Sequence, residues 1–191
     1  MGGFSTVATN TSGLEGRLEY IKNGVDEILA IVSAGSGGGV SSPIIQALLE
    51  TATTQVNAAT SSQIGMAFTS NGVTITKVVT CMSASGFAAS CKGHLYEVGA
   101  NDIPVGSPID SSSNTVSLFS DTRGTFVFTF NCPTVAGKRY LFAVEVTTGA
   151  SYVIFPSADV AVTDFSQQRT YTSSGGWVAR SRYMFLIVAG A

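Results

Sequence analysis

The segment Thr-Phe-Val-Phe-Thr-Phe, residues 125–130, places a phenylalanine at every second position. Successive side chains of a strand point to opposite faces of a sheet, so this spacing predicts a half-buried β-strand. Similar β-branched and aromatic runs occupy residues 73–79, 115–119 and 140–146, and turn-forming residues such as those at 70–72 separate them. These runs predict antiparallel strands joined by short turns.

Shorter runs of the same kind bring the expected number of strands in residues 63–191 to eight or nine. The sequence between these runs has no helical period. Many short strands without intervening helices are typical of two packed antiparallel sheets. We therefore expect a mainly β protein whose residues 63–191 form an antiparallel jelly-roll β-sandwich.

Residues 12–34 have a different period, because their apolar side chains recur at alternating intervals of four and three residues. This heptad spacing predicts a short coiled-coil-like helix, and Ser12 with Glu15 fits a capping box at its start. β-branched residues at both core positions of the heptad favour a three-helix coiled coil over a two-helix one, which predicts a homotrimer. The expected trimer interface consists of Leu14, Leu18, Ile21, Val25, Ile28 and Val32. The alternative is an amphipathic helix that packs on its own domain.

Three further segments complete the expected organisation. Residues 1–11 lack a helical period and are expected to form an extended arm, and the glycine- and serine-rich residues 35–42 predict a flexible hinge. Ser42 and Pro43 are typical of a helix start, so residues 43–62 are expected to form a short helix and a linker.

Composition disfavours several functional classes. Charged residues make up 12% of the chain and the net charge is −2, which provides no basic field for nucleic acid. Glycines and Pro43 interrupt the charge-free run from Ile28 to Leu49, so we expect no membrane-spanning helix and no membrane partner. One histidine and three cysteines leave little material for acid–base, nucleophilic or metal chemistry. We therefore expect no catalytic residues, no cofactor and no enzyme activity.

The three cysteines and the one histidine are the candidate zinc ligands of the chain, and the cysteines are also candidates for disulfides. Cys81, Cys91 and Cys132 are odd in number and lack the Cys-x-x-Cys spacing, which favours free core thiols over a disulfide framework. Cys91 and His94 have the spacing of half a zinc site, but a structural site needs four ligands. The sequence therefore predicts no metal site.

Two groups of side chains remain as candidate binding residues. A flat aromatic platform for a sugar ring is the first candidate, and a tryptophan that covers the core edge is its alternative. The platform residues would be Tyr140, Tyr152, Tyr171 and Trp177. The second candidate is a set of ion pairs across a subunit contact, with a solvated charged face as its alternative. The residues of this second set would be Arg169, Arg180, Arg182, Asp159 and Asp164.

Four motifs follow one another in the C-terminal two thirds of the chain. They are Phe126-x-Phe128-x-Phe130, Ala136-Gly137-x-x-Tyr140-x-x-x-Val144-Glu145, Ser174-Gly175-Gly176-Trp177 after Tyr171, and Tyr183-Met184-Phe185-Leu186-Ile187. Their order resembles a carbohydrate-module-like jelly roll of tailed-bacteriophage structural proteins. With a short heptad helix and a hinge before it, the chain is similar to a capsid decoration (cement) protein or a short virion fibre.

The resemblance implies a non-enzymatic protein on the virion surface, made in the host cytoplasm, whose partners are its own copies and the major capsid protein or another virion protein. Phe4 and Val7 of the strand-like arm are the residues expected to attach it to the particle. The alternative function is a carbohydrate-binding tail-fibre or receptor-binding module that recognises a glycan of the host surface.

Overall fold

The computed structural model of the chain describes residues 44–46, 52–57, 62–119, 123–149, 152–158, 165–172, 176–180, 182–184 and 186–190. These residues all belong to one compact unit, Gly39–Ala191. The expected arm, heptad helix and hinge lie outside the described residues, and so do Asp159 and Asp164. The attachment residues Phe4 and Val7 and the six residues of the expected trimer interface therefore stay predictions.

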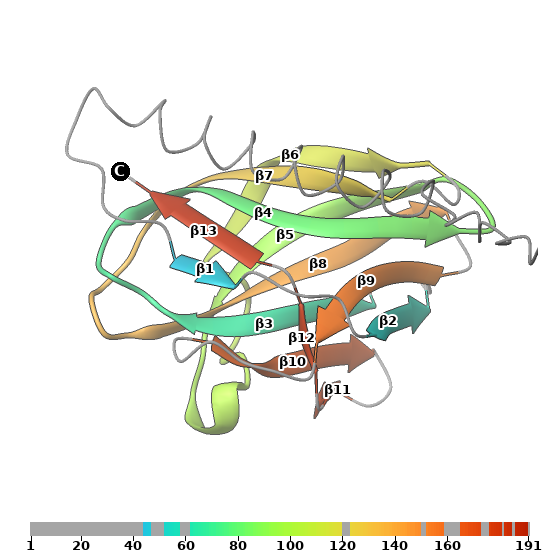
Figure 1. Cartoon of the computed structure of the whole chain (residues 1–191). Helices are drawn as coiled ribbons and strands as arrows, with labels where there is room; N and C mark the ends of the chain where they lie inside the picture. Colours follow the sequence, from blue (N-terminus) through green and yellow to red (C-terminus); the bar gives the residue numbers. More distant parts are fainter. Residues whose placement is uncertain are drawn as a thin grey trace, which may run out of the picture. The chain divides into compact units, whose positions relative to one another are not determined.

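The described residues form two antiparallel sheets (Figure 1). The seven-stranded sheet contains β1 (Ile44–Gln46), β2 (Ala52–Asn57), β4 (Thr74–Ser85), β7 (Gly124–Pro133), β9 (Tyr152–Ala158), β12 (Tyr183–Met184) and β13 (Leu186–Gly190). The six-stranded sheet contains β3 (Gln63–Thr69), β5 (Ala89–Glu97), β6 (Asp110–Leu118), β8 (Arg139–Gly149), β10 (Phe165–Thr172) and β11 (Gly176–Ala179). A mainly β protein is therefore confirmed for the described part of the chain.

The strands β2 to β9 alternate between the two sheets along the chain. In one sheet their order is β2-β9-β4-β7, and in the other it is β3-β8-β5-β6. The chain passes from one sheet to the other at every connection in this series except that between β5 and β6. The later strands extend this framework, because β10 adds to the free edge of β3 and β13 pairs with β4.

The main core lies between the two sheets and draws on both. Phe128 and Phe142 come from opposite sheets, and their ring centroids lie 5.4 Å apart. Phe130 meets Phe142 edge to face at 6.1 Å. Burial of each such side chain stabilises the fold by about 1.5–3 kcal/mol. The period of two at residues 125–130 therefore identified the strand and the residues that it buries.

The prediction of a short helix within residues 43–62 is wrong for the described residues of this segment. Residues 44–46 form β1, which pairs with β13, and residues 52–57 form β2, which pairs with β9 over six residues. Ser42 and Pro43 gave a local helix-start signal, but Ile44, Ile45 and the threonines of β2 are β-branched residues that fit a pleated sheet. Pairing with strands more than 90 positions later in the chain overrode the local signal.

Side chains of β6 form hydrogen bonds with the edge of β7 that pairs with no other described strand. The Asn114 carboxamide donates to the Val127 carbonyl oxygen at 2.8 Å and accepts from the Thr129 amide at 2.8 Å. Farther along, the Asn131 amide donates to the Asp110 carboxylate at 3.2 Å. Asn114 thus takes the place of a strand peptide, and it protects an edge that would otherwise be open to pairing.

Candidate functional site

The outward face of the six-stranded sheet is also partly apolar. Along β8 the side chains of Tyr140, Phe142 and Val144 join the main core, whereas Leu141 and Ala143 belong to a second cluster. Leu141 and Ala143 are fully buried, so other groups must cover this face. The second cluster consists of Ala67, Tyr96, Leu141 and Ala143, with Val98 and Trp177 packed against it.

Small residues leave space above the centre of this face. A Cβ added to Gly65 would lie 2.5 Å from the Phe142 carbonyl oxygen and 2.7 Å from the Leu141 Cδ2 atom. A larger side chain therefore does not fit at position 65, and Ala67 and Ala143 are nearly as small. The space above them is available to long side chains from neighbouring strands.

Aromatic rings occupy part of that space. Trp177 and Tyr171 are direct partners across β10 and β11, and their ring centroids lie 5.3 Å apart. Trp177 also meets Tyr96 edge to face at 5.8 Å. Tyr96 is buried, whereas Trp177 and Tyr171 are partly exposed. The exposed part of this aromatic group is therefore the Tyr171–Trp177 pair.

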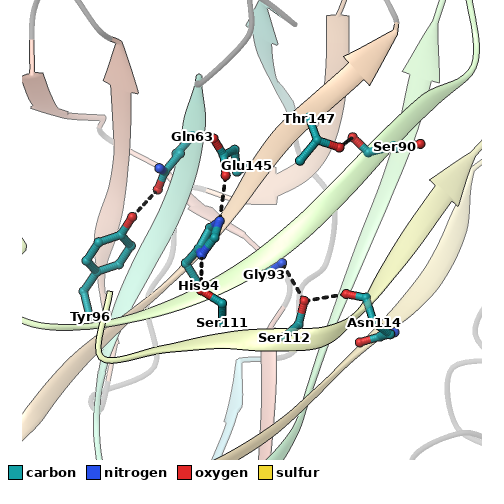
Figure 2. A network of polar contacts seen from close by, with 10 residues as sticks. All are labelled: Gln63, Ser90, Gly93, His94, Tyr96, Ser111, Ser112, Asn114, Glu145 and Thr147. Carbon is teal, nitrogen blue, oxygen red and sulfur yellow. Dashed lines mark hydrogen bonds and ion pairs between the residues drawn. The ribbon is translucent and has the colours of Figure 1, made fainter. Parts of the chain in front are cut away.

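A polar network adjoins the aromatic rings (Figure 2). The Tyr96 hydroxyl donates to Gln63 Oε1 at 2.8 Å, and burial raises the pKa of the Tyr96 phenol, so it stays a neutral donor. Gln63 stands between Tyr171 and Glu145 in the strand register, and Glu145 is next to Lys92. Aromatic and polar side chains thus form one continuous row across the sheet.

His94 links three strands within this network. Its Nε2 atom lies 2.7 Å from the Glu145 carboxylate and its Nδ1 atom lies 2.8 Å from the Ser111 hydroxyl. The serine, imidazole and carboxylate contact one another in the sequence that a nucleophile, a base and an orienting acid require.

The surrounding amides argue against acyl transfer at this serine. Such chemistry needs N–H donors aimed at a developing oxyanion. The Gly93 amide already donates to the Ser112 hydroxyl at 3.1 Å, and the Ser111 amide donates to Asp110 at 2.8 Å. The contacts of His94 link β6, β5 and β8 through side-chain hydrogen bonds.

The structure separates the Cys91 and His94 pair that could have formed half a zinc site. Cys91 is in the main core, whereas His94 contacts Glu145 and Ser111 on the outward face. Within the described ranges no group of three or more His, Cys, Asp or Glu side chains could hold a metal ion. Cys81, Cys91 and Cys132 are buried and form no disulfide, which confirms the expectation of core thiols.

The four residues of the expected sugar platform do not come together. Tyr171 and Trp177 are neighbours, but Tyr140 is only 3% exposed, and its hydroxyl accepts a hydrogen bond from the Val135 amide at 3.1 Å. Tyr152 is exposed but lies on β9 of the other sheet. Tyr96 was not among the predicted platform residues, although it lies two positions after His94 in a strand that alternates between the two faces.

The three arginines also have different environments. Arg169 is buried on the outward face, where its Nη2 atom donates to the Asn101 carbonyl oxygen at 2.7 Å. Arg180 is exposed, and its Nε atom donates to the Thr170 hydroxyl at 3.1 Å. Arg182 is partly buried. Because Asp159 and Asp164 lie outside the described residues, the expected ion pairs stay a prediction.

Comparison with known proteins does not identify a family for this chain. No protein-family model and no curated protein matches the chain. None of the residues that the structure describes belongs to a helix long and apolar enough to cross a membrane.

Proposed function

We propose that the chain is a non-enzymatic virion structural protein of a tailed bacteriophage. It is a homotrimeric capsid decoration protein or a short head fibre, and it attaches to the particle through its N-terminal segment. Its compact domain is a jelly roll. The strand orders β2-β9-β4-β7 and β3-β8-β5-β6 support that assignment, because two Greek keys folded into facing sheets produce this alternation.

The observation that carries the proposal is the heptad spacing of residues 12–34, which precede a sandwich with a core of its own. Among the described residues, both sheets contribute to the larger buried cluster. The six heptad residues Leu14, Leu18, Ile21, Val25, Ile28 and Val32 lie outside the described residues, and their spacing is typical of a seam between partner helices. Burial of such a seam between copies of the chain supplies a reason for its spacing.

Sedimentation equilibrium of the full chain tests the trimer. We expect a mass three times the 19.7 kDa of one chain. Ile21→Asn should weaken the trimer, because it places an amide in the expected seam, whereas Lys22→Asn, one position outside the seam, should leave it unchanged. A clean monomer at micromolar concentration contradicts the proposal.

Particle binding tests the attachment. Deletion of residues 2–9, which removes Phe4 and Val7, should leave the trimer intact and abolish decoration of particles in electron micrographs. With 12% charged residues the contacts should be mostly apolar, so attachment of the full chain should survive about 1 M salt. Normal decoration by the shortened chain contradicts the assigned role of the arm.

A second candidate is a carbohydrate-binding module for host attachment, and the Tyr171–Trp177 pair favours it. Sugar rings stack on partly exposed aromatic rings, and Gln63, Glu145 and Lys92 offer donors and acceptors beside them. Binding to a glycan array that is lost in Tyr171→Ala supports this function. A silent array, with iodide unable to quench Trp177 fluorescence, contradicts it.

A further inference from the structure

Arg169 has an unusual environment for a charged side chain. It is only 9% exposed and lies on the outward face of the six-stranded sheet, opposite Gly65 of β3. Its Nη2 atom donates to the Asn101 carbonyl oxygen, but Nε and Nη1 are shielded from solvent and have no hydrogen-bond partner among the described residues. A guanidinium stays protonated when buried, so these orphan donors belong to a full positive charge.

Nearby carboxylates are engaged elsewhere. Asp102, which adjoins the Asn101 carbonyl, forms an ion pair with Arg139, and Glu145 contacts His94. Within the described part of the chain no carboxylate contacts Arg169. Among the described residues, the outward face thus holds a buried cation without a counter-ion.

The aromatic pair lies close to this cation. Arg169 and Tyr171 are two positions apart on β10, so they share a face at a backbone spacing of about 7 Å. Tyr171 is in turn the direct partner of Trp177. The two ring planes are tilted by 46°, and a pyranose ring packed against the pair would hold a carboxylate substituent within reach of the guanidinium.

The segment that supplies the single partner of Arg169 is strained at its tip. Asn101 and Asp102 have φ values of 61° and 55°, and two adjacent non-glycine residues in the left-handed region are uncommon. The base of the segment is fixed by the Val98–Pro104 bridge and by a 2.9 Å bond from the Gly99 amide to the Ile103 carbonyl oxygen. The tip, Asn101 and Asp102, is thus the strained part of this segment.

The geometry of a guanidinium shows how a carboxylate can bind. Each of the two forks that can grip a carboxylate with parallel hydrogen bonds includes Nη2, together with either Nε or Nη1. Nη2 carries two N–H groups, one for each fork, and the Asn101 carbonyl oxygen accepts from one of them. A carboxylate that replaces this oxygen gains a complete fork, which the carbonyl alone cannot use.

We propose that this face binds a saccharide that carries a carboxylate, such as a uronic acid. The sugar ring stacks on Tyr171 and Trp177, and the carboxylate displaces the Asn101 carbonyl oxygen from Arg169. This inference rests on the second candidate function, the carbohydrate-binding module, and it names the ligand class of that site.

Fluorescence of Trp177, the sole tryptophan, reports on the site in the full-length protein. The probes are glucuronic acid, its methyl ester, glucose and acetate at pH 7. We expect a saturable change with glucuronic acid, and affinity for the uncharged ester and for glucose lower by about tenfold or more, which is 1.4 kcal/mol. Acetate should bind much more weakly, because it lacks the stacked ring.

Variants measure the contributions of the Arg169 guanidinium and of the Tyr171 ring to binding separately. Arg169→Lys keeps the charge but loses the fork, so it should weaken glucuronic acid binding by about tenfold, whereas Arg180→Lys, directly after the neighbouring strand β11, should change it less than twofold. Tyr171→Ala should weaken binding of the acid and the ester equally. The comparison of acid with ester needs no variant, so a folding defect in Arg169→Lys does not prevent the test.

Three other binding results would overturn the inference. Equal affinity for the acid, the ester and glucose overturns the inference and leaves the carbohydrate-binding function in place. Acetate that binds as tightly as glucuronic acid also overturns it, since the ring then contributes nothing. The absence of any change with all four probes overturns this inference alone, whereas a silent glycan array contradicts the carbohydrate-binding function itself.

Discussion

Replacement of Asn114 by alanine should weaken the junction between the two sheets. Asn114 bridges β6 to β7 through hydrogen bonds to the Val127 carbonyl oxygen and the Thr129 amide, each 2.8 Å long. Alanine removes both and leaves one backbone donor and one backbone acceptor without a protein partner. The substitution also opens the edge of β7.

The expected cost follows from the exposure of these groups. An intramolecular hydrogen bond contributes about 1 kcal/mol net, and a fully buried orphan group costs about 1–3 kcal/mol. Asn114 and Val127 are only half-buried and Thr129 is exposed, so water replaces part of what is lost. We therefore expect Asn114→Ala to lower the free energy of unfolding by about 1–2 kcal/mol. Asn114→Asp should cost at least as much, because it sets an acceptor against the Val127 carbonyl oxygen.

Urea unfolding followed by circular dichroism at one fixed protein concentration measures this difference, since assembly would make the stability depend on concentration. Ser113→Ala is the matched control, because the exposed Ser113 hydroxyl makes only one long contact, 3.3 Å to the Thr129 carbonyl oxygen. The control should lose less than about 0.5 kcal/mol. If Asn114→Ala costs no more than Ser113→Ala, the closure of the sandwich does not depend on this carboxamide.

Three further predictions concern the core and the domain organisation. Gly93→Ala should lower the free energy of unfolding by about 1–3 kcal/mol in urea titrations, because the new Cβ would lie 2.9 Å from the Phe128 and Phe142 rings. Burial raises the pKa of the Cys91 thiol to about 12, so in the native protein this thiol should resist iodoacetamide at pH 8. The unfolded chain releases the Cys91 proton near pH 9, so stability should fall between pH 9 and about 12, and Cys91→Ala should remove that part of the decline. Deletion of residues 1–38 should leave the strand signal in circular dichroism intact and abolish the trimer; loss of the strand signal would show that the sandwich needs this segment.

The strands were predictable where the two faces of a sheet differ. Residues 125–130 alternate between phenylalanine and smaller side chains, and that alternation identified both the strand and its buried face. Residues 44–46 and 52–57 carried weaker signals, since their pairing partners β13 and β9 lie far along the chain. Local capping residues could therefore suggest a helix there, and only the long-range pairing decided the outcome.

The site was harder to predict, because β8 is apolar on both faces. Residues 140–144 read Tyr-Leu-Phe-Ala-Val, and no alternation shows which side chains face the core. Tyr140 therefore seemed as suitable for a platform as Tyr171, although the structure buries one and partly exposes the other. The second apolar face has a physical cause of its own: the side chains above Leu141 and Ala143 come from β5 and β11, and they keep water away from that face. Two nitrogens of Arg169 are also buried without a partner among the described residues, and a sequence that places Arg169 on a strand cannot show this.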